Sequence, residues 1–258
     1  RTFGHKIFKL HEHLERFEKS LKYLNLDPGL SIKELASITE EVVARNLPLL
    51  NSGDDYWVTQ RVTRGLTGDD NEAWPDWPNA TVIIECTPLP LASRAKYYRD
   101  GIQIITPSIR RVAPEMASPR AKTHNYLNFV LGDLEVEAQN SDALSVLLDK
   151  NGNLAEGKGS NIFLIKDEKL VTPKEKYVLP GVSREVVIEL SKILEYEIKE
   201  DDIDLFDAYN ADEAFITGTP FCMLPVTSLN GLAIGDGKVG GIFSQLIKLW
   251  GENTGVNI

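Results

Sequence analysis

Apolar side chains recur every three or four residues in several stretches of the chain, which predicts amphipathic helices. These predicted helices cover residues 6–26, 31–50, 125–140, 183–196 and 240–250. The second begins with Ser31 and Glu34, the two residues of a capping box, so its first turn is specified by the sequence itself.

Short runs rich in β-branched residues, separated by Gly, Pro, Asn and Asp, predict strands. The predicted strands are 56–66, 80–89, 101–109, 143–149, 160–165, 169–173, 213–219 and 223–229. Turns such as DKNGN at 149–153 join neighbouring strands as hairpins, which favours a sheet with much antiparallel pairing over a doubly wound parallel sheet.

The order of these elements predicts two domains in an α+β or α/β fold. Two helices and three strands make a small α+β domain over residues 1–110. Residues 111–121 contain two prolines and no periodicity, and we interpret them as an interdomain linker. A larger domain with a mixed sheet follows over residues 122–258.

The charge balance excludes some classes of partner. The chain has 38 acidic and 28 basic residues, a net charge of -10, and no local basic patch, which argues against nucleic acid. No stretch approaches the roughly 18 apolar residues of a membrane span, and no signal peptide is evident. Cys86 and Cys222 form no disulfide framework, which fits a reducing cytoplasm, and we predict a cytoplasmic protein.

Three histidines near the start of the chain raise the question of a metal site. His5, His11 and His13 have no cysteine or carboxylate partner at ligand spacing. We therefore favour a helix with polar histidines on it and predict no metal.

Two glycine turns in the second half of the chain could bind an anion. In LPGVSRE at 179–185, the backbone N–H groups of Val182 and Ser183 lie at a helix start, where the helix dipole favours phosphate. In ITGTP at 216–220, a Thr-Gly-Thr turn offers a hydroxyl and approachable amides. Taken alone, each stretch is more often a plain turn than an anion-binding site.

Glu156 and Lys122 add the remaining groups. Glu156 precedes a buried strand, so it either faces solvent at the mouth of the strand or pairs with a cation or a protonated ring nitrogen. Lys122 follows the proline-bounded loop, where burial would favour its neutral, nucleophilic amine. A lysine, two phosphate turns and a carboxylate together are what pyridoxal phosphate requires.

The chain resembles the class IV, fold-type IV pyridoxal-phosphate enzymes, which include branched-chain and D-amino acid aminotransferases, (R)-amine transaminases and aminodeoxychorismate lyase. Several motifs carry the resemblance in the family's order: RTFGHKIFKLHEHLERF with its H-x-x-R element, AKTHNYLN, LLDKNGNLAEGKGSNIFLI, LPGVSRE and ADEAFITGTP. The family also has an N-terminal segment ahead of the position of Arg1, which we expect is unrecorded in this sequence.

The resemblance implies a role for each site residue. Lys122 would be the Schiff-base lysine and proton shuttle, Glu156 would contact the pyridine nitrogen, and Tyr126 would bind the phenolic oxygen. The remaining cofactor contacts are those of the phosphate: Arg16, the amides of Val182 and Ser183, and the turn of Gly218 and Thr219. The resemblance further implies ping-pong transfer of an amino group from a small-molecule donor to a keto acid, and a homodimer or higher homo-oligomer.

The substrate is less constrained. The resemblance places Arg61, Thr219 and Pro220 on the substrate side, although the tyrosine expected two positions before Arg61 is Thr59 here. The loop from Thr67 to Asn79 is acidic and lacks the arginine and histidine of D-amino acid enzymes, which counts against that specificity. Its acidic residues would repel a second carboxylate and its tryptophans could wall an apolar pocket: Asp69, Asp70, Glu72, Asp76, Trp74 and Trp77.

We therefore expect a branched-chain amino acid or an (R)-amine as donor. Two alternatives stay open: a lyase of the aminodeoxychorismate type, which would need no amino acceptor, and a D-amino acid aminotransferase. A non-catalytic protein on the same scaffold would have no need of Lys122.

Overall fold

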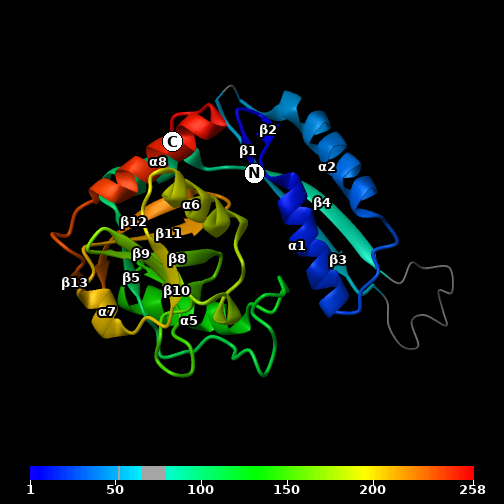
Figure 1. Cartoon of the computed structure of the whole chain (residues 1–258). Helices are drawn as coiled ribbons and strands as arrows, with labels where there is room; N and C mark the ends of the chain where they lie inside the picture. The colour runs from blue at the N-terminus through cyan, green and yellow to red at the C-terminus, as the bar shows by residue number, and fades with distance from the viewer. Residues whose placement is uncertain (52, 66–79) are drawn as a thin grey trace. The chain divides into compact units, whose positions relative to one another are not determined.

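The computed structural model describes residues 1–51, 53–65 and 80–258, which form two compact units, Arg1–Leu91 and Ala92–Ile258 (Figure 1). The acidic loop from Thr67 to Asn79 lies outside the described residues. The division comes before the boundary at residue 110 that the sequence predicted, and residues 111–121 lie inside the larger unit rather than between two units.

In its described residues, the smaller unit contains two helices and two hairpins. Its elements are β1 (Thr2–Phe3), β2 (Lys6–Ile7), α1 (Leu10–Tyr23), α2 (Ile32–Asn46), the 3-10 turn η1 (Leu47–Leu49), β3 (Tyr56–Thr63) and β4 (Thr81–Pro88). The predicted capping box is confirmed, because Ser31 N–H donates to Glu34 Oε2 at 2.8 Å and Glu34 N–H donates to Ser31 Oγ at 3.3 Å.

The two faces of the antiparallel β3–β4 pair differ. Tyr56 and Gln60 contact α2, since Tyr56 donates its hydroxyl to the carbonyl of Asn46 and Gln60 Nε2 donates to Thr39 Oγ1. Because side chains alternate along a strand, Thr59 and Arg61 point to the opposite face.

The larger unit is built on one mixed sheet with the strand order β10-β9-β8-β11-β12-β5-β6. The strands are β5 (Ile102–Ile105), β6 (Leu144–Ser145), β7 (Glu156–Gly157), β8 (Ser160–Lys166), β9 (Lys169–Pro173), β10 (Ile198–Asp201), β11 (Glu213–Gly218), β12 (Cys222–Leu229) and β13 (Leu232–Ala233). The pairs that join β9, β8, β11 and β12 are antiparallel, whereas β10, β5 and β6 join in parallel, so the mixed sheet is as predicted.

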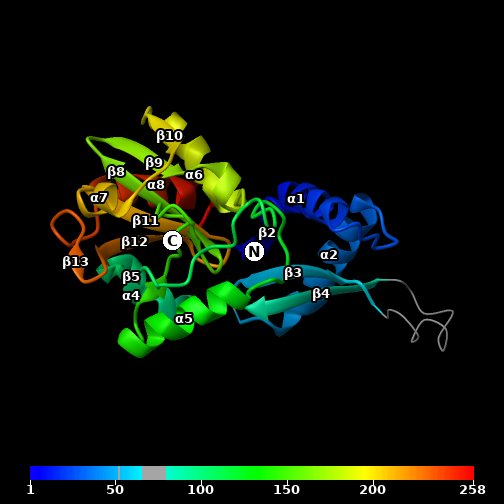
Figure 2. The same cartoon turned by 90° about the horizontal axis from the view of Figure 1, so that it is seen from below.

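Helices lie on both sides of this sheet. They are α4 (Leu91–Asp100), α5 (Leu127–Gln139), the 3-10 turn η2 (Glu175–Tyr177), α6 (Val182–Ile193), α7 (Leu205–Tyr209) and α8 (Gly241–Thr254). Phe163 and Phe215 stack on the face toward α6 and α8, and Phe243 of α8 packs against Phe215. Figure 2 shows α5 on the opposite side of the sheet.

In the middle of the chain, the sequence placed one strand in the wrong domain and missed one helix. The strand predicted at 101–109 was given to the small domain, but β5 pairs in parallel with β12 and so belongs to the larger sheet. Residues 91–100 form α4, which the sequence did not reveal because its polar residues leave little apolar periodicity. Across the described ranges, no helix combines the length and apolarity required to cross a membrane.

Candidate functional site

Glu156 lies at the edge of the large sheet, where β7 turns back along β8. Its side chain is buried, and each carboxylate oxygen accepts one hydrogen bond: Oε1 from Arg111 Nε at 2.8 Å and Oε2 from the backbone N–H of Leu179 at 2.9 Å. A carboxylate can accept about four hydrogen bonds, so it retains the capacity for another donor.

The electrostatic state of Glu156 reflects its burial. Desolvation raises the pKa of the Glu156 carboxyl group above its ordinary value, while the charges of Arg111 and Lys122 and the hydrogen bond from Leu179 act in the opposite direction. Lys122 is therefore near enough for its charge to act on Glu156, and the structure brings these two predicted site residues together.

Lys122 and Tyr126 lie just before α5 on a segment without helix or strand. Lys122 is exposed in the structure, and its burial beside a cofactor stays a prediction. The ring of Tyr126 lies 6.3 Å from that of Phe129, and the Arg111 guanidinium lies 4.8 Å from the Phe129 ring centroid. Tyr126, Phe129 and Arg111 thus connect the lysine segment to Glu156.

The first predicted phosphate turn is tied directly to Glu156. Leu179 donates its N–H to Glu156, and its carbonyl accepts from Asn161 Nδ2 at 3.0 Å. Gly181 is the N-cap of α6, and a Cβ there would lie 2.2 Å from Asn161 Oδ1, so a larger residue would displace the Asn161 side chain. The N–H groups of Val182 and Ser183 follow in the first helical turn, where no intrahelical acceptor exists for them.

The second predicted turn lies beside the first. Gly218 pairs with Cys222 across β11 and β12, and a Cβ at Gly218 would lie 2.6 Å from the carbonyl oxygen of Gly159 in the β7–β8 hairpin. Thr217, directly before it, pairs with Asn161. Glu156 and both turns therefore meet at one edge of the sheet.

Side chains of helix α4 donate hydrogen bonds to the carbonyl groups of this second turn. The carbonyl of Pro220 accepts from Arg94 Nη1 at 2.9 Å, and the carbonyl of Phe221 accepts from the Tyr98 hydroxyl at 2.6 Å. Proline has no backbone N–H, and Phe221 N–H donates to Gly218 within the turn. Thr219 is thus left to supply the donors that a ligand would use.

Arg16 and Arg61 belong to the smaller unit, and their roles stay predictions. Arg16 lies on α1, with Nη2 3.4 Å from His13 Nδ1. Arg61 Nη2 lies 2.6 Å from Glu85 Oε1, an oxygen that also accepts from Thr59. The guanidinium expected to bind a substrate carboxylate is therefore already paired with an acid.

The sequence interpretation missed Arg111 and Asn161, and also Arg94 and Tyr98 of α4. One rule pointed toward Arg111: a buried carboxylate requires a cation or several donors. Nothing in the spacing indicated which of the 28 basic residues would provide it, since Arg111 and Glu156 are 45 positions apart.

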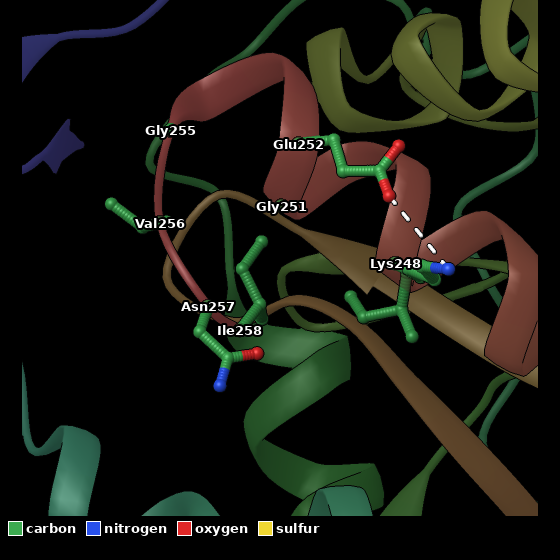
Figure 3. A pocket seen from close by; sticks show the side chains of 8 residues that line it. Lys248, Gly251, Glu252, Gly255, Val256, Asn257 and Ile258 are labelled. Carbon is green, nitrogen blue, oxygen red and sulfur yellow. Dashed lines mark ion pairs between the residues drawn. The ribbon is translucent and has the colours of Figure 1, made fainter.

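The pocket in Figure 3 lies elsewhere, at the end of α8. It is lined by the final turns of that helix and the residues after it, including Lys248 and Glu252, whose charged groups lie 3.9 Å apart. None of the predicted site residues lines this pocket. The candidate site is therefore defined by Glu156 and the hydrogen-bond donors around it rather than by the pocket.

The residues at the sheet edge fit pyridoxal phosphate. The Glu156 carboxylate suits a protonated ring nitrogen, and the start of α6 and the Gly218–Thr219 turn suit a phosphate group. Asn161 and Glu156 bind the carbonyl and the N–H of one residue, Leu179, and this contact fixes the spacing between Glu156 and the start of α6.

The chain is similar to known proteins over most of its length. A family model described as amino-transferase class IV matches residues 1–229. A Methanocaldococcus jannaschii protein, provisionally named a branched-chain-amino-acid aminotransferase, is 34% identical over 95% of this chain and 82% of its own length. The branched-chain-amino-acid aminotransferase of Escherichia coli K12 is 30% identical over 94% and 77%.

Solved structures support the same relationship. The crystal structure of the Escherichia coli branched-chain amino acid aminotransferase matches with a TM-score of 0.86 at 29% identity, over 97% of this chain and 81% of that one. The branched-chain amino acid aminotransferase of Thermobaculum terrenum, solved in its PLP form, matches with a TM-score of 0.83 at 26% identity, over 96% and 78%. The predicted fold-type IV architecture is confirmed.

Proposed function

Because the chain belongs to the class IV aminotransferase family, a family of pyridoxal-phosphate enzymes, we propose that it transfers the amino group of an apolar, branched-chain amino acid to a 2-keto acid. The observation that supports the site assignment is the pair of hydrogen bonds to Leu179. Through this one residue, Glu156, the proposed partner of the ring nitrogen, is linked to Asn161 beside the proposed phosphate turns. Ping-pong kinetics follow, because the amino group stays on the enzyme between the two substrates.

When bound, pyridoxal phosphate supplies a conjugated ring that accepts the electron pair left when the α-proton departs. Glu156 would keep the ring nitrogen protonated, and Tyr126 would orient the ring through the phenolic oxygen. The amides of Val182 and Ser183 and the Gly218–Thr219 turn would hold the phosphate. Lys122 would carry the proton between the α-carbon of the donor and C4′ of the cofactor.

The relatives named above are branched-chain enzymes, which supports an apolar donor. An (R)-amine is the second candidate donor. Two features favour it, because each removes a donor that could bind an α-carboxylate. Arg61 is already paired with Glu85, and Pro220 has no backbone N–H.

We propose a homodimer because α5 presents exposed apolar side chains at helical spacing, which are Leu127, Val130, Leu131 and Leu134. The free cysteines Cys86 and Cys222 support a reducing, cytoplasmic location. Light scattering after size-exclusion chromatography measures the mass of the assembly, and a monomer at working concentration would contradict the dimer.

A half-reaction panel tests the proposed donor. The loaded protein is mixed with L-leucine, D-alanine or (R)-1-phenylethylamine, and the loss of the visible cofactor absorption is followed. L-Leucine is expected to react fastest, and Lys122→Ala to slow the reaction by roughly 10²–10⁴-fold. A faster reaction with D-alanine would contradict the proposal, and pyruvate release without a keto acid would indicate the lyase.

A further inference from the structure

Arg111 is a cation that the structure places against Glu156. The side chains of the two residues are 12% and 6% exposed, and Arg111 Nε lies 2.8 Å from Glu156 Oε1. The guanidinium also lies over the ring of Phe129, and the backbone N–H of Arg111 donates to the carbonyl of Leu148 at 2.9 Å. Contacts to both the backbone and the side chain therefore fix Arg111 beside the carboxylate.

This pair is poorly explained as a device for stability. Desolvation of two charges offsets much of their attraction, and an apolar pair of similar volume is often as stable. Burial raises the pKa of Glu156 despite Arg111, Lys122 and the Leu179 N–H, so ionisation of the carboxyl group costs free energy at this place. Such costs are typical of functional sites.

The protonation state of Glu156 matters for any pyridine ring that it binds. An ionised carboxylate stabilises a protonated ring nitrogen, whereas a protonated carboxyl group donates its proton in a hydrogen bond to a neutral nitrogen. Among the described residues, the cations whose charges act on Glu156 are Arg111 and Lys122. Lys122 is committed to the proposed chemistry, so Arg111 is the cation available to hold the carboxylate ionised.

We propose that Arg111 is a positioning residue that orients Glu156 and keeps it ionised, and through it keeps the proton on the ring nitrogen of the cofactor. Arg111 engages Oε1 and Leu179 engages Oε2, which leaves further lone pairs for the ring N–H. This inference rests on the proposed role of Glu156.

The direct test is nitrogen-15 NMR of full-length protein loaded with pyridoxal phosphate labelled at the ring nitrogen. Arg111→Gln is expected to move the signal toward that of the unprotonated nitrogen, as Glu156→Gln does. Arg111→Lys should restore part of the protonated signal, because it keeps the charge but not the planar fork. Arg110→Gln, an exposed neighbour of the same charge, should leave the signal unchanged.

Cofactor affinity provides a second measurement. Arg111→Gln is expected to weaken pyridoxal phosphate binding by roughly 10–100-fold, the range for a hydrogen bond to a charged group. Binding of an analogue with a C–H group in place of the ring nitrogen should be unchanged. In a Glu156→Gln background, Arg111→Gln should add no further loss, because Arg111 acts through Glu156.

Three outcomes would overturn the inference, each with a different meaning. A protonated signal in Arg111→Gln together with a changed signal in Glu156→Gln removes the role of Arg111 alone. An unchanged signal in Glu156→Gln removes the assignment of Glu156 as well. An equal loss of affinity for the cofactor and for its C–H analogue shows that Arg111 acts on the fold or the phosphate site.

Discussion

Two arginine–glutamate pairs, one in each compact unit, show that distance is a poor guide to the strength of an ion pair. Arg61 and Glu85 lie 2.6 Å apart with side chains 37% and 39% exposed, whereas Arg111 and Glu156 lie 2.8 Å apart but are 12% and 6% exposed. Water screens the first pair, and its loss costs little. In the second pair, removal of one partner leaves a charge in a place that water scarcely reaches.

The difference extends to the surroundings of each pair. Glu156 is fixed by Arg111 and Leu179 and is continuous with the phosphate turns through Asn161. Arg61 is a strand residue whose contacts with Glu85 can exchange with solvent. Glu156, on the cofactor side of the proposed site, is thus preorganised. Arg61, the proposed substrate-side arginine, can change its contacts.

The largest expected effect is on the buried pair. Arg111→Gln should lower the free energy of unfolding by about 3–5 kcal/mol at neutral pH, because it leaves Glu156 buried without its cation. Urea denaturation of the cofactor-free protein measures the loss. The Arg111→Gln/Glu156→Gln double variant should recover most of it, and equal instability of both variants would show that packing of the guanidinium dominates.

The phosphate turn should respond next. Gly181→Ala places a methyl group against Asn161 Oδ1 and should cost about 1–3 kcal/mol of stability, with weaker binding of pyridoxal phosphate. The matched control is Gly159→Ala, since a Cβ at Gly159 meets no atom within 4 Å. Thermal denaturation and cofactor titration check both variants, and similar losses in the two would contradict the tight fit at Gly181.

Glu156→Gln should separate stability from function. Because the folded-state pKa of Glu156 is raised, its contribution to stability is present below the ordinary glutamate pKa and is lost as pH rises through the raised pKa. Relative to the native protein, the cofactor-free Gln variant should therefore become more stable from acid to neutral pH, although it also leaves Arg111 without its carboxylate partner. Denaturation at acid and at neutral pH measures the difference in the free energy of unfolding between the two proteins. If the native protein became more stable relative to the variant as the pH rises, the prediction would be contradicted.

The exposed pair should give the smallest change in stability. Arg61→Gln and Glu85→Gln should each alter the free energy of unfolding by about 0–1 kcal/mol. Their kinetics should differ in sign: KM for an amino acid rises in Arg61→Gln and falls in Glu85→Gln, where the arginine is released. Identical KM values in both variants and the native protein would remove Arg61 from the substrate site.

The sequence was sufficient for features that depend on local contacts. The capping box of Ser31 and Glu34 closes within one helical turn, and α6 and α8 follow from apolar periodicity. Helix α4 escaped prediction because its residues are mostly polar, and β5 was placed in the wrong unit because a strand pattern does not specify its partner. The mixed sheet itself followed from the hairpin turns.

The sequence by itself determined the family, because the order and spacing of its motifs can be recognised without a structure. It also identified Lys122, Glu156 and the two glycine turns as candidate site residues. Only the tertiary structure decided what holds Glu156, because Arg111, Leu179 and Asn161 come from separate segments of the chain. It also decided that Lys122 is exposed and that Arg61 is paired with Glu85. The free energy of a charged side chain depends on its burial and on its partners from distant segments. Neither can be predicted from the spacing of residues in the sequence.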